Sequence, residues 1–141
     1  MAMCGLTAVC LTGWAFDPKS GVDPSTFLVP GVTHLGVDFD GISSTSGYHD
    51  YTVALANVVA FCAKHGLTWG VPEFGANRAT NDLTGDVRAQ WLLSWAAKFR
   101  DAGAEYVCLW EQTSQAGSCF TTPAEVATVR AMLALGPRAA A

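Results

Sequence analysis

Glu73 is the residue whose type and position most clearly suggest chemistry. It lies in the segment Gly70-Val71-Pro72-Glu73-Phe74-Gly75, where it closes an apolar run. Acidic side chains are rarely placed in such runs without a partner or a function. The carboxylate can serve as a nucleophile, or it can cap or pair with neighbouring groups in a structural role. The sequence predicts a functional carboxylate at the C-terminal end of a buried strand.

Polar and aromatic residues also follow the other apolar runs. Carboxylates there can bind hydroxyl groups of a ligand or donate a proton, and the flat face of tryptophan can stack on an apolar ligand surface. Each has a structural alternative, which is a solvated loop pair for the carboxylates and core packing for the tryptophans. The candidate binding residues are Trp14, Asp38, Asp40, Asn77 and Trp110, and the candidate acids are Glu111 and Asp40.

Composition argues against several other classes of function. Half of the 141 residues are apolar, 14% are charged and the net charge is −4, so no basic surface for nucleic acid or an anionic membrane is expected. The sequence contains no run of about 18 apolar residues and no signal-peptide pattern, and the compartment stays open. There is no glycine-rich nucleotide motif and no C-x-x-C pair, and the three histidines lack ligand spacing, so we expect no metal and no cofactor.

The elements that must position these residues form a regular alternation. Four short apolar runs predict strands, and three segments with apolar residues at helical spacing predict helices. The near-continuous apolar character of the strands is typical of parallel strands buried on both faces. Cys10, Cys62 and Cys108 lie in apolar runs and are expected as small core residues. The predicted strands are Leu6–Phe16, Thr33–Phe39, Thr68–Phe74 and Glu105–Trp110, and the predicted helices are Tyr51–His65, Asp86–Ala102 and Pro123–Leu135.

This order predicts an α/β domain over residues 1–136, followed by a disordered tail at 137–141. The link between the first two strands, Asp17–Val32, has room for at most one helical turn around Pro24–Leu28. Two architectures fit the alternation: a doubly wound open sheet and part of a (β/α)8 barrel. Carboxylates and tryptophans gathered at the C-terminal ends of the strands favour the barrel, because barrel active sites are built there.

Three segments resemble clan A glycoside hydrolases, the retaining (β/α)8 enzymes. Val71-Pro72-Glu73-Phe74-Gly75 is similar to the seventh strand of that clan, in which the glutamate is the nucleophile. His34 to Asp40 is similar to the sixth strand, and Tyr106 to Trp110 is similar to the eighth, whose tryptophan forms the floor of a sugar subsite. Gly13-Trp14 loosely resembles part of the fifth strand.

The resemblance implies the C-terminal half of a TIM barrel, with four parallel strands and about three helices. The acid/base glutamate of the clan lies on the fourth strand, after an asparagine, and this sequence has no Asn-Glu pair. Glu111 is the best substitute within the chain. Since a nucleophile must stay ionised, hydrogen-bond donors are expected around Glu73, with Asn77, Arg78 and Trp69 as candidates.

The expected function is retaining hydrolysis of a β-linked polysaccharide or oligosaccharide, incomplete without the acid. The alternatives are a non-catalytic carbohydrate-binding or structural half-barrel, and an open α/β domain with a small ligand. The expected partners are a carbohydrate and, through the exposed sheet edges, either a second copy or an N-terminal half-barrel.

Overall fold

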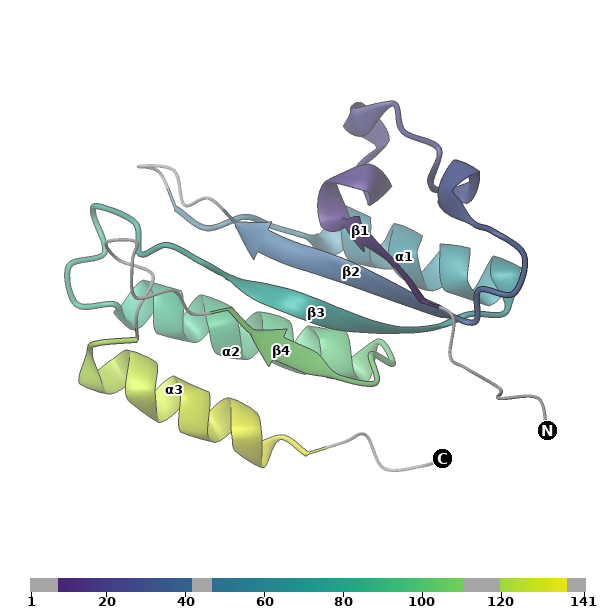
Figure 1. Cartoon of the computed structure of the whole chain (residues 1–141). Helices are drawn as coiled ribbons and strands as arrows, with labels where there is room; N and C mark the ends of the chain where they lie inside the picture. The colour runs from purple at the N-terminus through teal and green to yellow at the C-terminus, as the bar shows by residue number, and fades with distance from the viewer. Residues whose placement is uncertain (1–7, 42–46, 111–119, 137–141) are drawn as a thin grey trace.

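The computed structural model describes residues 8–41, 47–110 and 120–136, which form one parallel sheet with helices packed against it (Figure 1). The four strands are β1 (Ala8–Thr12), β2 (His34–Gly41), β3 (Thr68–Ala76) and β4 (Val107–Leu109). They lie in the order β1-β2-β3-β4, and every neighbouring pair is parallel. The prediction of an α/β domain with four parallel strands is confirmed.

Three α-helices follow β2, β3 and β4 along the chain, namely α1 (Thr52–His65), α2 (Asp86–Asp101) and α3 (Pro123–Ala134). Helix α1 ends at Gly66, whose φ of 66° lies in the left-handed region that glycine adopts without strain. Helix α3 begins with a capping box, in which Thr122 and Glu125 each accept a hydrogen bond from the other's backbone N–H. All three predicted helices are confirmed, with ends within one residue of the prediction.

The first strand is shorter than predicted. It ends at Thr12, and the chain then turns into the 3-10 helix η1 (Gly13–Phe16), where the apolar run had suggested a continuing strand. The following link holds two further 3-10 helices, η2 (Pro18–Ser20) and η3 (Pro24–Phe27), rather than one turn. Each begins with an aspartate, Asp17 or Asp23, whose side chain accepts a backbone N–H two residues on. Such Asx turns followed by proline favour tight turns over a strand.

The main core lies between the sheet and the helices. Alternate residues of β2, Leu35, Val37 and Phe39, are fully buried and pack with apolar side chains of α1 and α2. Phe39 stacks on Phe99 of α2 at 4.7 Å between ring centroids, and Phe74 of β3 meets the same ring edge-on. Figure 1 shows α1 and α2 behind the strands, on the same face of the sheet.

No helix of the described residues covers the opposite face, which we call the open face. Cys10 and Cys108 lie on it and are exposed, so the prediction that they are core residues is wrong; only Cys62, on α1, is buried as predicted. Their places alternate with those of the residues that face the helices. The open face therefore carries cysteines that are accessible in the structure.

One aromatic side chain partly closes the open face near the start of the strands. The Tyr106 ring lies over Gly70, where an added Cβ would come within 2.5 Å of it. The Tyr106 hydroxyl lies 3.1 Å from Nε2 of His34, and Nδ1 of His34 lies 2.7 Å from the Thr68 hydroxyl. Both ring nitrogens of this buried histidine therefore have partners, as the burial of a polar ring requires.

The strand order rules out a doubly wound sheet for the described residues, one of the two architectures considered from the sequence. In a doubly wound sheet the strand order reverses and the helices cover both faces. Here the strands follow one another without reversal, and since parallel crossovers share one hand, the crossover helices lie on one face. The described residues thus form a singly wound sheet. None of their helices is long and apolar enough to cross a membrane.

Candidate functional site

A β-bulge in β3 sets the orientation of Glu73. Between Val71 and Phe74, β3 has one residue more than either neighbouring strand, because both the β2 and β4 registers shift there. Proline cannot donate a ladder hydrogen bond, so Pro72 favours an irregularity at this point. Bulges re-aim side chains and are frequent beside active sites. Glu73 is exposed, whereas Val71 and Phe74 on either side of the bulge are buried among the helices.

Asp38 lies on β2, the strand next to Glu73, and is held by Cys10 of β1. The Cys10 thiol donates a hydrogen bond to Asp38 Oδ2 at 3.3 Å. The other carboxyl oxygen, Oδ1, is buried and accepts no hydrogen bond from the described residues. A buried oxygen without a donor is costly, which makes Oδ1 a natural place for a proton or a ligand hydroxyl.

Both carboxylates act on the pKa of the Cys10 thiol. Burial is the largest cause that raises this pKa to about 12, followed by the hydrogen bond to Asp38 and by the negative charges of Asp38 and Glu73. The thiol therefore stays protonated at neutral pH and remains a donor to Asp38. Cys10 and Asp38 are in contact on the open face, and the charge of Glu73 on the next strand acts on the same thiol.

Trp110 follows β4 and lies beside the end of β3. Its backbone N–H donates to Phe74 O at 2.8 Å. Gly75 makes this approach possible, since a Cβ there would lie 3.1 Å from the Trp110 carbonyl oxygen. The predicted subsite tryptophan is thus half-buried and directly follows Leu109, the ladder partner of Phe74.

A cavity of about 600 Å³ opens between the C-terminal ends of β1 and β2, η1, η2 and the start of α1. Two residues predicted to bind substrate, Trp14 and Asp38, both line it. Trp14 is 62% exposed, so its ring is available to a ligand. Gly13 holds the turn that presents it, because a Cβ at Gly13 would come within 2.8 Å of the Phe39 ring.

Two further carboxylates of this cavity are engaged in local turns. Asp17 Oδ1 accepts the backbone N–H of Lys19 at 2.8 Å. Asp50 Oδ1 accepts both the backbone N–H and the hydroxyl of Thr52, and these hydrogen bonds hold the pKa of Asp50 below its usual value. Among the described carboxylates of the cavity, Asp38 is the one without such a turn.

The expected donors to Glu73 are located elsewhere. Trp69 is buried in the core on the helix-covered face, so its prediction as a donor is wrong. Arg78 lies 3.9 Å from Glu125 of α3 and is drawn to that carboxylate. Asn77 follows β3 and is half-buried, and its Oδ1 has no donor among the described residues.

A buried network supports the chain that follows Glu73. Arg88 of α2 and Glu125 of α3 are fully buried and form an ion pair at 3.1 Å. Glu125 also accepts the backbone N–H groups of Thr121 and Thr122, each at 3.0 Å. An ion pair this deep needs such additional hydrogen bonds to offset its desolvation. The network fixes the start of α2 against the start of α3.

Two predicted residues fall where the structure gives no side-chain description. Glu111 lies outside the described residues, and Asp40 belongs to β2 but its side chain is likewise outside the description. Within the described part of the chain, no group of three or more histidine, cysteine or acidic residues could hold a metal ion.

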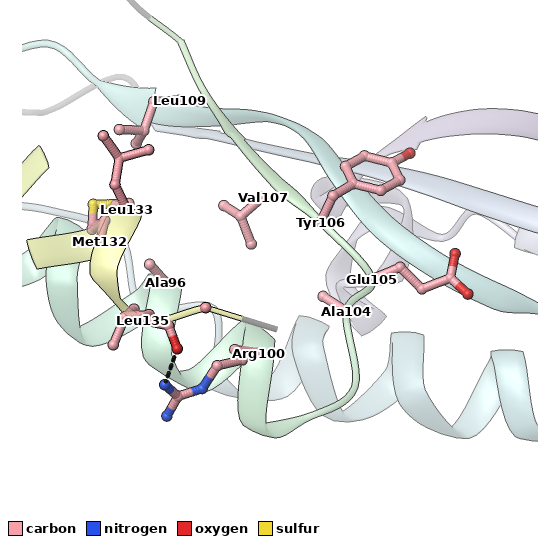
Figure 2. A pocket seen from close by; sticks show the side chains of 11 residues that line it. Ala96, Arg100, Ala104, Glu105, Tyr106, Val107, Leu109, Met132, Leu133 and Leu135 are labelled. Carbon is pink, nitrogen blue, oxygen red and sulfur yellow. Dashed lines mark hydrogen bonds between the residues drawn. The ribbon is translucent and has the colours of Figure 1, made fainter. Parts of the chain in front are cut away.

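A second cavity, of about 390 Å³, lies between β4, α2 and α3 (Figure 2). Its lining is mostly apolar, and its one carboxylate, Glu105, comes before β4 rather than after it. Arg100 at its border donates to the Leu135 carbonyl oxygen and pairs with Asp101. This cavity is therefore separate from the carboxylates at the strand ends.

Two features of the site were missed from the sequence. Cys10 was assigned to the core, and only the tertiary pairing of β1 with β2 places its thiol at Asp38. The bulge was also missed, although a proline within a predicted central strand is a signal for it. A search of the sequence against family profiles and against curated proteins finds no match.

Proposed function

We propose that this chain carries the nucleophile and a sugar-binding surface of a retaining glycoside hydrolase that acts on a β-linked saccharide. Glu73 is the nucleophile, Trp110 and Trp14 offer apolar faces to sugar rings, and Asp38 binds a hydroxyl group or a proton. The observation that carries the proposal is the β3 bulge, which leaves Glu73 exposed beside Asp38 on the open face.

The same proposal includes the architecture. Four sequential parallel strands with helices on one face are what one half of a (β/α)8 barrel contains. The accessible positions of Cys10 and Cys108 are those that face a barrel interior, where the other strands would cover them. A half-barrel therefore accounts for the accessible cysteines on a face that no described helix covers.

A trapping experiment tests the role of Glu73 without a general acid. The chain is incubated with a panel of 2,4-dinitrophenyl 2-deoxy-2-fluoro-β-glycosides, whose leaving group departs without a proton. We expect the intact mass to rise by one fluoroglycosyl group and peptide mapping to place the group on Glu73, because a retaining nucleophile forms a covalent intermediate.

The matched variants are Glu73→Gln and Glu105→Gln. Both remove an exposed carboxylate from the same sheet, but Glu105 lies before β4, near His34. Labelling should disappear in the first variant and persist in the second. Labelling that survives Glu73→Gln, or that never occurs with any sugar of the panel, rules out the nucleophile.

A non-catalytic sugar-binding role is the second candidate. It is favoured by the positions of Arg78 and Trp69, since neither of these expected donors contacts Glu73. Binding of an oligosaccharide by calorimetry, weakened by Trp14→Ala but not by Glu73→Gln and without covalent labelling, would identify a binding protein.

A further inference from the structure

We propose that Asp38 is the proton donor and acceptor that works with Glu73, so that the described strands hold both carboxyl groups of the reaction. The assignment rests on the proposed function and deepens it. In the glycoside hydrolases that the sequence resembles, the acid is a glutamate that follows an asparagine; this sequence has no such pair, and Glu111 was the expected substitute. The contacts of Asp38 supply a different answer within β2.

The position of Asp38 in the sheet supports this role. Asp38 pairs with Thr12 of β1 and lies opposite the bulge of β3, so it is on the strand adjacent to Glu73. Both carboxylates act on the Cys10 thiol, one through a hydrogen bond and both through their charge. Retaining enzymes need two carboxyl groups about 5–5.5 Å apart, and because neighbouring strands lie about 4.8 Å apart, carboxyl groups on one face of adjacent strands can reach this separation.

The hydrogen bonding of the Asp38 carboxyl group also supports the role. Oδ2 accepts the Cys10 thiol, which fixes the orientation of the group, while Oδ1 has no donor among the described residues. An acid must hold a proton on an oxygen that no other donor occupies. Cys10 is accordingly a positioning residue, and Oδ1 is the oxygen open to exchange a proton with the substrate.

The cavity at the C-terminal ends of β1 and β2 supports the same role. Asp38 lines it together with Trp14, so a sugar stacked on that ring lies within the same cavity as the carboxyl group. Asp17 and Asp50 line it too, but each has an oxygen bound to its own turn. Asp38 is thus the described carboxylate that connects this cavity with Glu73.

The proposed hydrolysis has two steps. In the first, a Glu73 oxygen bonds to the anomeric carbon, the bond from that carbon to the leaving oxygen breaks, and the leaving oxygen takes its electron pair together with the proton from Asp38. In the second, water bonds to the anomeric carbon and gives a proton to the Asp38 carboxylate, and the bond to Glu73 breaks. Both carboxyl groups return to their initial states.

The test compares leaving groups in the whole chain and in Asp38→Asn. A phenyl β-glycoside needs a proton for its leaving oxygen, and a 2,4-dinitrophenyl β-glycoside does not. We expect kcat/KM of the variant to fall about 100-fold or more on the phenyl substrate and to change less than about threefold on the dinitrophenyl substrate. Asp17→Asn, in the same cavity, should show no such difference between substrates.

Azide gives a second readout. It attacks without a base, so it should restore turnover of the dinitrophenyl substrate by Asp38→Ala and yield the β-glycosyl azide. With Glu73→Ala the product should instead be the α-glycosyl azide, since one inversion replaces two. Cys10→Ala removes only a positioning contact, so its loss of kcat/KM on the phenyl substrate should be smaller than that of Asp38→Asn. Its kcat/KM on the dinitrophenyl substrate should match that of the unaltered chain.

A wrong assignment of the acid and a wrong assignment of the nucleophile would give different results. If Glu73 is labelled but Asp38→Asn lowers both substrates equally, or neither, the acid assignment is wrong and the nucleophile stands. If the unaltered chain is not labelled and hydrolyses neither substrate, both proposals are wrong. Circular-dichroism melting of each variant separates these results from loss of the fold, because a folded variant keeps the melting curve of the unaltered chain.

Discussion

The contact between Cys10 and Asp38 makes the thiol a fixed hydrogen-bond donor on an otherwise accessible surface. A thiol reacts through its thiolate, so the raised pKa and the exposed position have opposite effects on its reactivity. Burial of the sulfur, the hydrogen bond and two nearby carboxylates all favour the protonated form. Accessibility alone therefore does not describe how this cysteine behaves.

We predict that iodoacetamide at pH 8 alkylates Cys108 well before Cys10, although both are exposed. With a pKa of about 12, roughly one Cys10 thiol in ten thousand is ionised at that pH. The rate at Cys10 should rise about tenfold per pH unit between pH 7 and 10, measured by peptide mapping. Equal rates at the two cysteines would rule out the contact.

The same assay separates the causes of the shift. Asp38→Asn removes one charge and the charged acceptor, so the pKa of Cys10 should fall and its alkylation rate should rise by roughly three- to tenfold. Burial, the largest cause, is unchanged, so the rate should stay below that of Cys108. Asp17→Asn is the control and should leave Cys10 unaffected.

At this scale the sequence identifies residues by chemical type, and the structure adds their neighbours. Trp14 and Asp38 could be assigned to a binding surface because both follow strands. The partner of Arg78 could not be predicted, because Glu125 is 47 positions later in the sequence and its burial depends on how α3 packs against α2.

Helix α2 has an unusual N-terminus, where the capping side chain precedes the helix by four residues. Gly85 at the N-cap position has no side chain, and Asp82 instead accepts the backbone N–H groups of Val87 and Arg88, at 3.3 and 2.7 Å. The Tyr48 hydroxyl also donates to Asp82 at 2.8 Å. Burial opposes the charge of Asp82, but these hydrogen bonds together outweigh it and hold its pKa below the usual value.

Asp82→Asn should destabilise the chain by about 1 kcal/mol at pH 7, as loss of a cap does. Because the folded pKa of Asp82 is lowered, its stabilisation is fully present above the unfolded value of about 3.9 and is lost as pH falls through the lower folded value. The Tm difference between the two proteins should therefore hold from pH 7 to about pH 4 and shrink below it.

Asp86→Asn is the control, since Asp86 is exposed in the first turn of α2, at the positive end of the helix dipole. Its Tm should change by less than that of Asp82→Asn at pH 7. A Tm difference for Asp82→Asn that stays constant down to pH 2.5 would show that charge plays no part in the cap.

Elements were predictable where one signal dominates. Helical spacing, with Gly66 after α1 and Thr122 before α3, located the helices. The end of β1 was not predictable from its apolar residues, because Ala15 and Phe16 are buried in the core through a 3-10 turn rather than a strand. Apolar residues report burial, and burial is common to both conformations.

For the whole molecule, the edges of the sheet matter most. Within the described residues, no strand pairs with the outer edge of β1 or of β4. Unpaired edges promote association. We expect the chain to associate with a second copy or, under the half-barrel proposal, with a partner that extends the sheet.

We predict that the mass measured by light scattering after gel filtration rises with protein concentration. Cys108→Lys places a charge on β4, next to its free edge, and should shift the chain towards the monomer. Ala63→Lys, on the exposed side of α1, is the control and should not. A monomer at every concentration up to about 10 mg/ml would argue against the half-barrel proposal.

The sequence predicted the order of strands and helices, because each βα unit carries its own pattern. Closure of the sheet could not be predicted in the same way, since the curvature and the partners of the edge strands depend on residues outside these units. The uncovered positions of Cys10 and Cys108 became evident only in the structure.

The sequential order of the strands also bears on how the chain folds during synthesis. Ala8 pairs with His34, His34 with Thr68, and Val71 with Val107, so each new strand joins one that left the ribosome one βα unit earlier. No strand has to be inserted between two others, and the loops to be closed are short compared with the whole chain. The growing end of the sheet is always an edge ready to accept the next strand, whether that strand belongs to the same polypeptide or to another.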